Sequence, residues 1–294
     1  MPLWVLESTE RRMGSSTGAV PRLGLRWYGR SSVGCVRANN EDNLCARGLL
    51  AENGPSSGTE DALEGTSGLD RPGVLLAVAD GIGGERAGEV ASGMAVSILA
   101  ETLAQRAGRG NDAETAREDL HAALVAAVLL ASERIRDEGA SNPSRARMGT
   151  TLTAAWMLDD VAMLAHVGDS RAYLWRGGKL QQLTRDQTWA EKLLEDNIIG
   201  PDEVGRVAGR HILMQALGSD EDIEVAVSTV AVEDGDTMLF CTDGLSGVVP
   251  EDVLRDELHR GGQLEGLVDR LIHGAERRGG PDNITLLAAR IAAL

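Results

Sequence analysis

The sequence has few cysteines and a deficit of basic residues, and each shortage excludes a class of protein. Only three of the 294 residues are cysteine (Cys35, Cys45 and Cys241). They are too few and too scattered for a disulfide framework or a thiolate zinc site. The 29 lysines and arginines against 45 aspartates and glutamates give a net charge of −16. This balance argues against nucleic-acid binding, because that affinity comes largely from basic residues that displace counterions from phosphates.

Long hydrophobic runs are also missing. No run approaches the ~18 consecutive apolar residues that a membrane-spanning helix needs. Glu7, Glu10 and Arg11 interrupt the N-terminus before the apolar core of a signal peptide could form. The composition, 43% hydrophobic and 25% charged, is ordinary for a globular protein. We therefore expect a soluble, reduced, cytoplasmic protein that does not bind a membrane.

The chain divides into a leader and one domain. Residues 1–24 lack clear periodicity and mix Gly, Ser and Arg, which predicts a poorly ordered leader. Residues 25–294 are predicted to form a single domain. Within it, residues 52–72 are rich in Gly, Ser and acidic residues, which favours a surface loop between two strands because turn-forming polar residues cannot fill a core.

The rest of the chain alternates strand-like and helix-like segments. The continuous apolar run 73–79 is typical of a strand buried on both faces. Apolar spacing predicts long helices over 85–106 and from Asp112, a candidate cap, to about 138, with shorter helices over 188–196, 202–217, 251–258 and 263–277. Further strands are predicted over 151–157, 161–167, 172–176, 179–183, 223–230, 237–242 and 283–291. Strands outnumber helices and hairpins separate many of them, which indicates antiparallel sheets with helices packed outside, an α+β layered domain.

Four aspartates stand at strand ends beside Gly or another turn-forming residue: Asp80, Asp169, Asp243 and Asp282. Any one of them reads most simply as a turn aspartate. Several converging carboxylates without Lys or Arg beside them would repel one another unless a cation lay between them. Because the candidate ligands are all oxygens, Mg²⁺ or Mn²⁺ fits better than Zn²⁺. The four together indicate a metal site.

A polar cluster near the N-terminus adds an arginine. Arg37 precedes the acidic pair Glu41-Asp42 by a few residues. The planar guanidinium can hold two phosphate oxygens at once. Alone the signal is weak, since polar turns often contain such residues.

Taken in order, these segments resemble the metal-dependent protein phosphatases of the protein phosphatase 2C family, in their compact bacterial form, from about Leu25 to Ile291. Any one of the motifs is common by chance, whereas all seven in this order are specific. The motifs are Arg37 with Glu41-Asp42, Asp80-Gly81-Ile82-Gly83-Gly84, Gly149-Thr150-Thr151, Gly168-Asp169-Ser170-Arg171, Leu183-Thr184-Arg185-Asp186, Thr242-Asp243-Gly244-Leu245 and Asp282-Asn283-Ile284-Thr285.

The resemblance implies a four-layer α-β-β-α sandwich, two antiparallel sheets flanked by helices, with the site at one edge. It implies an enzyme, a protein serine/threonine phosphatase that hydrolyses phosphoserine and phosphothreonine with a metal-activated water. Its partners would be phosphorylated proteins, including a cognate bacterial Ser/Thr kinase and its substrates, and it would act as a monomer in signal transduction.

The resemblance also implies roles for the motif residues. Two Mn²⁺ or Mg²⁺ ions would be bridged by Asp80, with Asp243 and Asp282 completing the first. The carbonyl of Gly81 would complete the second ion, with Glu41 and Asp42 nearby, directly or through water. Asp169 would help Asp243 to hold a third, weaker ion. Arg37 would bind the substrate phosphate.

The chain departs from the family pattern at two positions. Ile82 stands where some members carry a histidine that protonates the leaving oxygen, so that the proton would come from elsewhere, such as a water at the metals. Gln187 stands where a histidine is frequent, just before an expected mobile flap at about 188–217. His166 and Cys241 are interpreted as packed core residues, while the role of His211, in the flap, stays open.

Two other functions compete with the phosphatase. An inactive scaffold that binds phosphoprotein or senses another ligand would usually have lost a motif carboxylate, and all are present here. A metal-dependent hydrolase of small phosphorylated molecules is also possible, although nothing resembles a nucleotide pocket or a phosphate-binding Gly-rich helix start.

Overall fold

A computed structural model describes residues 22–294 except 50–56, 59–61, 84–86, 109–116 and 220–221. The expected leader therefore lies outside the described residues apart from its last three. Of these, Leu23 and Gly24 already belong to strand β1. Asp112, the expected helix cap, also lies outside the described residues.

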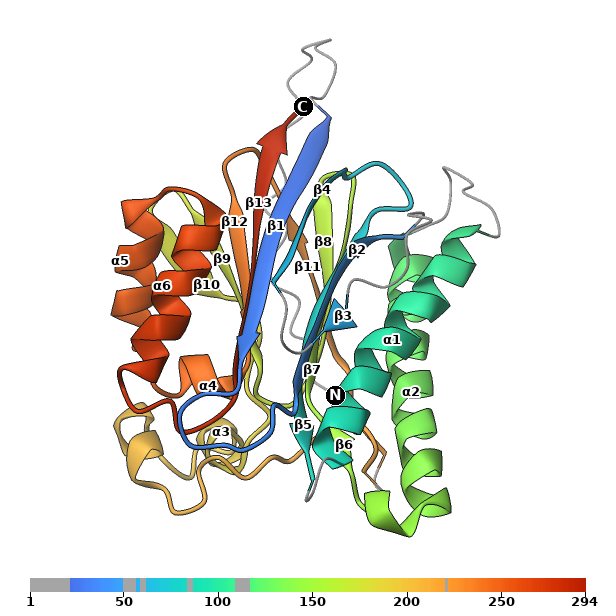
Figure 1. Ribbon diagram of the computed structural model, residues 1–294, viewed down its shortest axis with the longest axis vertical. Helices are drawn as coiled ribbons and strands as arrows, with labels where there is room; N and C mark the ends of the chain where they lie inside the picture. Colours follow the sequence, from blue (N-terminus) through green and yellow to red (C-terminus); the bar gives the residue numbers. More distant parts are fainter. Residues whose placement is uncertain (1–21, 50–56, 59–61, 84–86, 109–116, 220–221) are drawn as a thin grey trace.

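Two antiparallel sheets pack face to face, and helices cover the outer face of each (Figure 1). The first sheet has the order β10 (Lys179–Gln182), β9 (Arg171–Arg176), β12 (Thr237–Cys241), β13 (Ile284–Ala293), β1 (Leu23–Ser32), β4 (Leu63–Gly68). The second has the order β11 (Ala226–Ala231), β8 (Val161–Val167), β7 (Leu152–Leu158), β5 (Val74–Ile82), β2 (Asp42–Gly48), β3 (Ser57–Gly58), with β6 (Gly149–Thr150) paired to the end of β5. This arrangement confirms the predicted α-β-β-α sandwich.

Strand β5 explains why the central run is apolar at every position. Leu75 and Ala77 pack against the helices α1 (Ala87–Gly108) and α2 (Arg117–Ser141). Leu76 and Val78 point the other way, into the core between the two sheets. Alternate side chains thus fill two different cores, so no position can be polar until the strand reaches its end.

The other helical layer covers the first sheet. Helices α5 (Glu251–Arg260) and α6 (Leu264–Glu276) pack on β12 and β13, with Leu254, Leu267 and Leu271 in their shared core. Among the described residues, no helix is long and apolar enough to cross a bilayer.

The prediction of a surface loop over 52–72 is wrong for its second half, because Leu63–Gly68 form β4. In the pairing of β4 with β1, Gly65 lies opposite Trp27. A side chain at Gly65 would collide with the indole ring of Trp27. The small residues that resemble a turn signal here make room for a large aromatic ring in a neighbouring strand.

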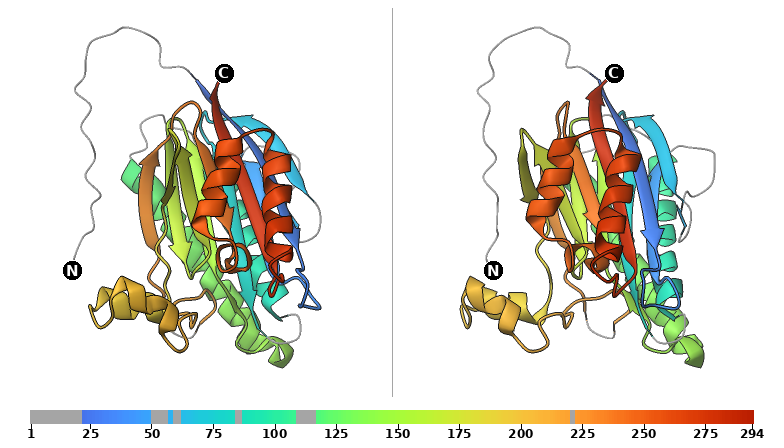
Figure 2. Two further views of the ribbon diagram at one scale, coloured as in Figure 1. Left: turned by 90° about the vertical axis from the view of Figure 1, so that its left-hand side faces the viewer. Right: turned by 60° about the vertical axis from the view of Figure 1, so that its left-hand side comes forward.

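The predicted helix over 202–217 is also wrong. Only the 3₁₀ turn η2 (Pro201–Arg206) is helical there. The chain beyond it bonds back to residues at the start of the flap: Met214 N–H donates to the Gln187 carbonyl at 2.8 Å, and Trp189 N–H donates to the Ile212 carbonyl at 2.8 Å. Backbone groups used in this way are not available for a helix. Figure 2 shows α3 (Trp189–Glu195) and η2 projecting beside the end of the sandwich; the mobility of this flap stays a prediction.

Candidate active site

Carboxylates from both sheets meet at one end of the sandwich, where strands β2, β5, β12 and β13 begin or end (Figure 1). Asp42 opens β2 and lies opposite Asp80 of β5 in the antiparallel register. Asp243 follows β12 as the first residue of the short helix α4 (Asp243–Ser246). Asp282 precedes β13. The sheet pairings therefore bring together residues that are up to two hundred and forty positions apart.

Asp42 is fully buried behind this cluster. Its Oδ2 accepts hydrogen bonds from Thr242 Oγ1 at 2.8 Å and from Thr285 Oγ1 at 2.7 Å. Its Oδ1 is buried and has no hydrogen-bond partner among the described residues. Burial raises the pKa of Asp42 to about 7, against the opposing effect of the two threonines. The two threonines hold one carboxylate oxygen and leave the other free.

Asp80 and Asp243 influence each other's pKa at close range. Loss of surrounding water, together with the charges of Asp42, Asp243, Asp169 and Asp282, raises the pKa of Asp80 well above its usual range. Burial and the charge of Asp282 likewise raise the pKa of Asp243, whose Oδ1 is also buried without a partner in the described part of the chain. Negative charge is thus concentrated here at a cost in free energy.

Divalent cations fit these features. In the described part of the chain two buried carboxylate oxygens lack partners, the neighbouring carboxylates repel one another, and the donors are all oxygens, which hard ions prefer. Among the same residues, no group of three or more His, Cys, Asp or Glu side chains is arranged to hold a metal ion by itself. An ion at this cluster would therefore need water or main-chain ligands as well, and Mg²⁺ usually keeps several waters.

The main chain of Asp80 is held firmly. Its N–H donates to Thr151 Oγ1 at 3.0 Å, and its carbonyl accepts from Thr151 N–H at 2.9 Å and from Thr150 Oγ1 at 2.8 Å. The Gly-Thr-Thr motif therefore acts as a support for Asp80, a role that the sequence did not reveal.

Gly81 and Glu41 lie side by side. Gly81 N–H donates to the Glu41 carbonyl at 3.1 Å. A side chain at Gly81 would collide with the carbonyl oxygens of Glu41 and Gly88. A Cβ at Gly88, in turn, would lie 2.7 Å from Glu41 Oε2. Only glycine lets the backbone of β5, the start of α1 and the Glu41 carboxylate approach this closely.

Arg37 lies at the exposed rim. Its Nη2 donates to Asp282 Oδ2 at 2.7 Å, with about half of the arginine side chain exposed. This hydrogen bond raises the pKa of Arg37, with help from the charges of Asp282, Glu41 and Asp80. Arg37 is therefore charged and within electrostatic range of the carboxylate cluster.

Asn283 holds the loop that carries Arg37, a role that the sequence pattern did not reveal. Its Nδ2 donates to the Val33 carbonyl at 3.0 Å and to the Asn39 carbonyl at 2.8 Å. Its Oδ1 accepts from Glu41 N–H at 2.8 Å. The Asp282-Asn283 dipeptide thus supplies a carboxylate to the cluster and a support for the loop opposite.

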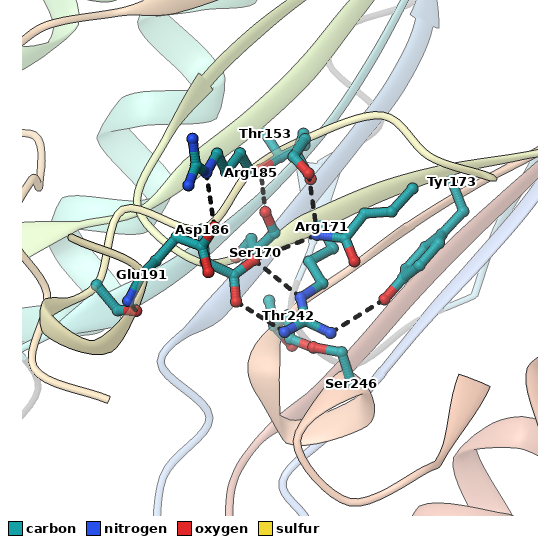
Figure 3. A network of polar contacts seen from close by, with 12 residues as sticks. Thr153, Ser170, Arg171, Tyr173, Arg185, Asp186, Glu191, Thr242 and Ser246 are labelled. Atoms are coloured by element: carbon teal, nitrogen blue, oxygen red, sulfur yellow. Dashed lines mark hydrogen bonds and ion pairs between the residues drawn. The ribbon is translucent and has the colours of Figure 1, made fainter. Parts of the chain in front are cut away.

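Asp169 lies on the flap side of the cluster. Burial and the charges of Asp243 and Asp186 raise its pKa to about 7, while Arg171 opposes the shift. Arg171 is itself bound in bidentate fashion, Nε to Asp186 Oδ1 at 2.9 Å and Nη2 to Asp186 Oδ2 at 2.7 Å (Figure 3). Arg171 is therefore a structural partner of Asp186, which leaves Asp169 facing other carboxylates.

The remaining singled-out residues have clear surroundings. His166 is buried in β8, between Thr153 Oγ1 at 2.8 Å and the Arg185 carbonyl at 3.0 Å, and Cys241 is buried in the core under α6; both confirm the packed-core interpretation. Gln187 Oε1 accepts a hydrogen bond from Gly168 N–H at 2.7 Å, so the residue just before the flap is held beside Asp169. His211 is exposed, and its charge lowers the pKa of Asp243, so it lies near the cluster.

Comparison with known proteins places the chain close in sequence to bacterial phosphatases. The family model described as "Protein phosphatase 2C" matches residues 56–286. Serine/threonine protein phosphatase PstP of Mycobacterium tuberculosis is 35% identical over 269 residues, covering 92% of this chain but 45% of PstP. The chain therefore spans slightly less than half the length of that relative. Serine/threonine phosphatase stp of Listeria welshimeri is 34% identical over 258 residues, covering 88% of this chain and 92% of stp.

Solved structures agree with this placement. The crystal structure of Mycobacterium tuberculosis PstP/Ppp superposes with a TM-score of 0.73 at 34% identity, covering 91% of this chain and 98% of that one. The catalytic domain of PstP in complex with two manganese ions superposes with a TM-score of 0.71 at 35% identity, covering 92% of this chain and 99% of that one.

Proposed function

Because this chain belongs to the protein phosphatase 2C family, we propose that it is a protein serine/threonine phosphatase that hydrolyses phosphoserine and phosphothreonine. The observation that carries the proposal is the gathering of Asp42, Asp80, Asp243 and Asp282 at one end of the sandwich beside Arg37. Carboxylates with partnerless oxygens are suited to divalent ions, and an exposed arginine at their rim is suited to a phosphate.

The metal ligands belong to the same proposal. Asp80, Asp243 and Asp282 would hold two Mn²⁺ or Mg²⁺ ions, with the Gly81 carbonyl and with Glu41 and Asp42 nearby. Asp169 and Asp243 would hold a third, weaker ion. When bound, such ions activate a water molecule and neutralise charge on the phosphoryl oxygens. The manganese in the PstP catalytic domain supports the choice of metal.

Arg37 positions the phosphate. Among the described residues its side chain makes one hydrogen bond, to Asp282, and about half of it is exposed. A guanidinium has five N–H donors, so the remaining ones can bind two phosphate oxygens at the mouth of the site. Its charge attracts the substrate to the cluster and helps to offset the repulsion between phosphate and carboxylates.

Ile82 cannot donate a proton, although it lies at the position where a protonating histidine occurs in some family members. The leaving oxygen would then take its proton from water at the site. A pH–rate profile tests this step: an essential acid that disappears on mutation of one side chain would contradict it.

The biological setting belongs to the same proposal. The substrates would be phosphorylated proteins, the enzyme would oppose a cognate Ser/Thr kinase, and it would act as a monomer in the cytoplasm. The names of the bacterial relatives support a role in serine/threonine phosphorylation.

The first experiment measures phosphate release from a phosphothreonine peptide with Mn²⁺, with Mg²⁺ and with EDTA. We expect release with either metal and none with EDTA. In the same assay the variant Asp80→Asn should release no phosphate. Its matched control is Asp119→Asn, which changes a carboxylate on the exposed face of α2 and should keep full activity. A folded protein that releases no phosphate with any metal would contradict the proposal, and faster hydrolysis of nucleotides than of the peptide would favour a small-molecule hydrolase.

A further inference from the structure

A pocket opens at the end of strand β5, two residues beyond Asp80. It has a volume of about 420 Å³ and lies between β6, the last turns of α2 and the end of the flap, with Ile82, Arg136, Arg147, Met148 and Gly218 among its lining residues. Figure 1 shows β6 and the end of α2 at the same end of the molecule as the end of β5 and α4. No residue assigned above to the metals or to the phosphate lines it.

The pocket shares a wall with the active site. Asp80 and Ile82 are two residues apart on β5, so their side chains leave the same face of the strand. That face carries Leu76 and Val78 into the core between the sheets, and it opens to solvent at Ile82, whose side chain is 38% exposed. Two residues of extended chain span about 7 Å. A peptide whose phosphate lies at the carboxylate cluster would therefore have its neighbouring residues within reach of this pocket.

Two arginines line the pocket, Arg136 and Arg147. Within the part of the chain that the structure describes, neither makes an ion pair or a side-chain hydrogen bond. The neighbouring carboxylate Glu138 is already occupied by Arg145, whose Nη1 lies 2.5 Å from Glu138 Oε1. Arg136 is half-buried and Arg147 is exposed. In a chain of net charge −16, two guanidinium groups around one pocket form a local attraction for an anion.

Arg147 also holds an unusual backbone conformation. Its φ is 63°, in the left-handed region that a residue with a Cβ rarely adopts. The turn is closed by Met148 N–H, which donates to the Arg145 carbonyl at 3.2 Å. A residue with a long charged side chain stands where glycine or asparagine would be less strained, which is an indication that the arginine serves a purpose there.

The wall of the pocket is built before any ligand arrives. Leu217 and Thr150 exchange two backbone hydrogen bonds, at 3.1 and 2.9 Å. Gly218 N–H donates to Ser132 Oγ at 3.0 Å, and a Cβ at Gly218 would strike Ile135 and the Met148 carbonyl. Because Thr150 Oγ1 also donates to the Asp80 carbonyl, one residue fixes both the pocket and the active-site aspartate. A preformed site loses little entropy when a ligand binds.

We propose that this pocket is a second-anion subsite, in which Arg136 and Arg147 bind a phosphate or carboxylate group that the substrate protein carries a few residues from the phosphoserine or phosphothreonine being hydrolysed. The inference rests on the proposed phosphatase function and names its substrate class: phosphoproteins with a second phosphorylated or acidic residue near the target. The two sources share one chemistry, and the experiment separates them.

The test compares phosphothreonine peptides that differ at one flanking residue, moved stepwise along both sides of the phosphothreonine. That residue is alanine, glutamate, lysine or a non-hydrolysable phosphonate analogue of phosphoserine. We expect the best-placed anionic peptide to exceed the alanine peptide about tenfold in kcat/KM, as charge-assisted hydrogen bonds would give. The lysine peptide should fall below the alanine peptide, and added salt should shrink the preference. Comparing kcat/KM of the glutamate peptide with that of the phosphonate peptide shows whether the subsite favours a carboxylate or a phosphate group.

Variants link the preference to the pocket. Arg136→Gln combined with Arg147→Asn should remove most of the tenfold preference and leave kcat/KM for the alanine peptide within about twofold. Asparagine is chosen at 147 because it tolerates left-handed backbone. Arg134→Gln is the matched control: it lies on the same helix and lines a different groove, between α1 and α2. This control should keep the full preference, and equal melting temperatures would show that all variants fold.

Two results would overturn the subsite: equal kcat/KM for alanine and anionic peptides at every flanking position, or a preference that survives in the double variant. Failure of the phosphatase proposal looks different, because then no peptide releases phosphate with any metal. In that case fluorescence anisotropy with the same peptides still decides the subsite. The anionic peptide should bind more tightly than the alanine peptide to the wild type, and the double variant should lose this difference; if it does not, the subsite is refuted.

Discussion

Arg37 and Asp282 form an ion pair of 2.7 Å at the rim of the carboxylate cluster, although they are 245 residues apart in the chain. The expected phosphate-binding residue is thus bonded to an expected metal ligand. Asn283, next to Asp282, fixes the loop that carries Arg37. The proposed phosphate-binding and metal-binding residues are therefore connected through Asp282 and Asn283, two adjacent residues of one loop.

Arg37→Ala should mainly raise KM for a phosphopeptide, because the substitution removes the donors for the phosphate and leaves the carboxylates in place. We expect a loss of about tenfold or more in kcat/KM, in the range of a charge-assisted pair. Steady-state kinetics at saturating Mn²⁺ measure it. Arg26→Ala, an exposed arginine on β1, is the control. An unaltered KM would remove the assigned role.

Asp80→Asn should abolish turnover and preserve the fold. It should also raise the melting temperature of the metal-free protein, because burial and then the neighbouring carboxylates raise the pKa of Asp80 and so disfavour its charged form in the folded state. Millimolar Mn²⁺ should stabilise the wild type, since metal binds only the folded site, and should stabilise this variant much less. Thermal scans with Mn²⁺ and with EDTA test both points, with Asp119→Asn as the control. Equal Mn²⁺ stabilisation of the variant and the wild type would show that Asp80 is not a ligand.

Asn283→Ala should destabilise the protein and weaken substrate binding together. The buried amide makes three hydrogen bonds to the loop at 33–41, and their loss leaves three backbone groups without partners, at a cost of about 2–4 kcal/mol. Urea unfolding and KM measure the two effects. Asn142→Ala, whose side chain bonds only within its own turn, should cost about 1 kcal/mol and leave KM unchanged. A normal KM for Asn283→Ala would contradict this prediction, because it would show that the loop at 33–41 does not need Asn283 in order to bind substrate.

His166 should make the protein less stable in acid. Burial lowers its pKa to about 4, whereas an unfolded histidine titrates near 6.5. Unfolding therefore takes up a proton between these values, so stability is complete above pH 6.5 and falls as the pH drops towards 4. The fall amounts to about 3 kcal/mol. The difference in free energy of unfolding between wild type and His166→Gln, followed from pH 7.5 to 4, isolates this contribution from the carboxylates. A difference that does not change with pH would contradict it.

The sequence by itself determined the layers and most of the chemistry. The apolar run of β5, the hairpin before β10 and the spacing of α1, α2, α5 and α6 are local patterns, and local patterns record which face of an element is buried. The strand-end aspartates were visible for the same reason, since a charged residue ends an apolar strand abruptly. Arg37 could be grouped with these aspartates because it belongs to the same family pattern.

Only the tertiary structure decided how these residues meet. The pairing of Asp42 with Asp80, the support of the Arg37 loop by Asn283 and the position of two arginines beside Ile82 depend on strand register and on contacts between distant segments. Gly65 shows the limit most clearly: the composition around it predicts a loop, but it lies in a strand opposite Trp27, whose indole occupies the space that a side chain at Gly65 would need. Periodicity is a property of neighbours in the chain, whereas register is selected by packing between residues far apart, and no local pattern carries that information.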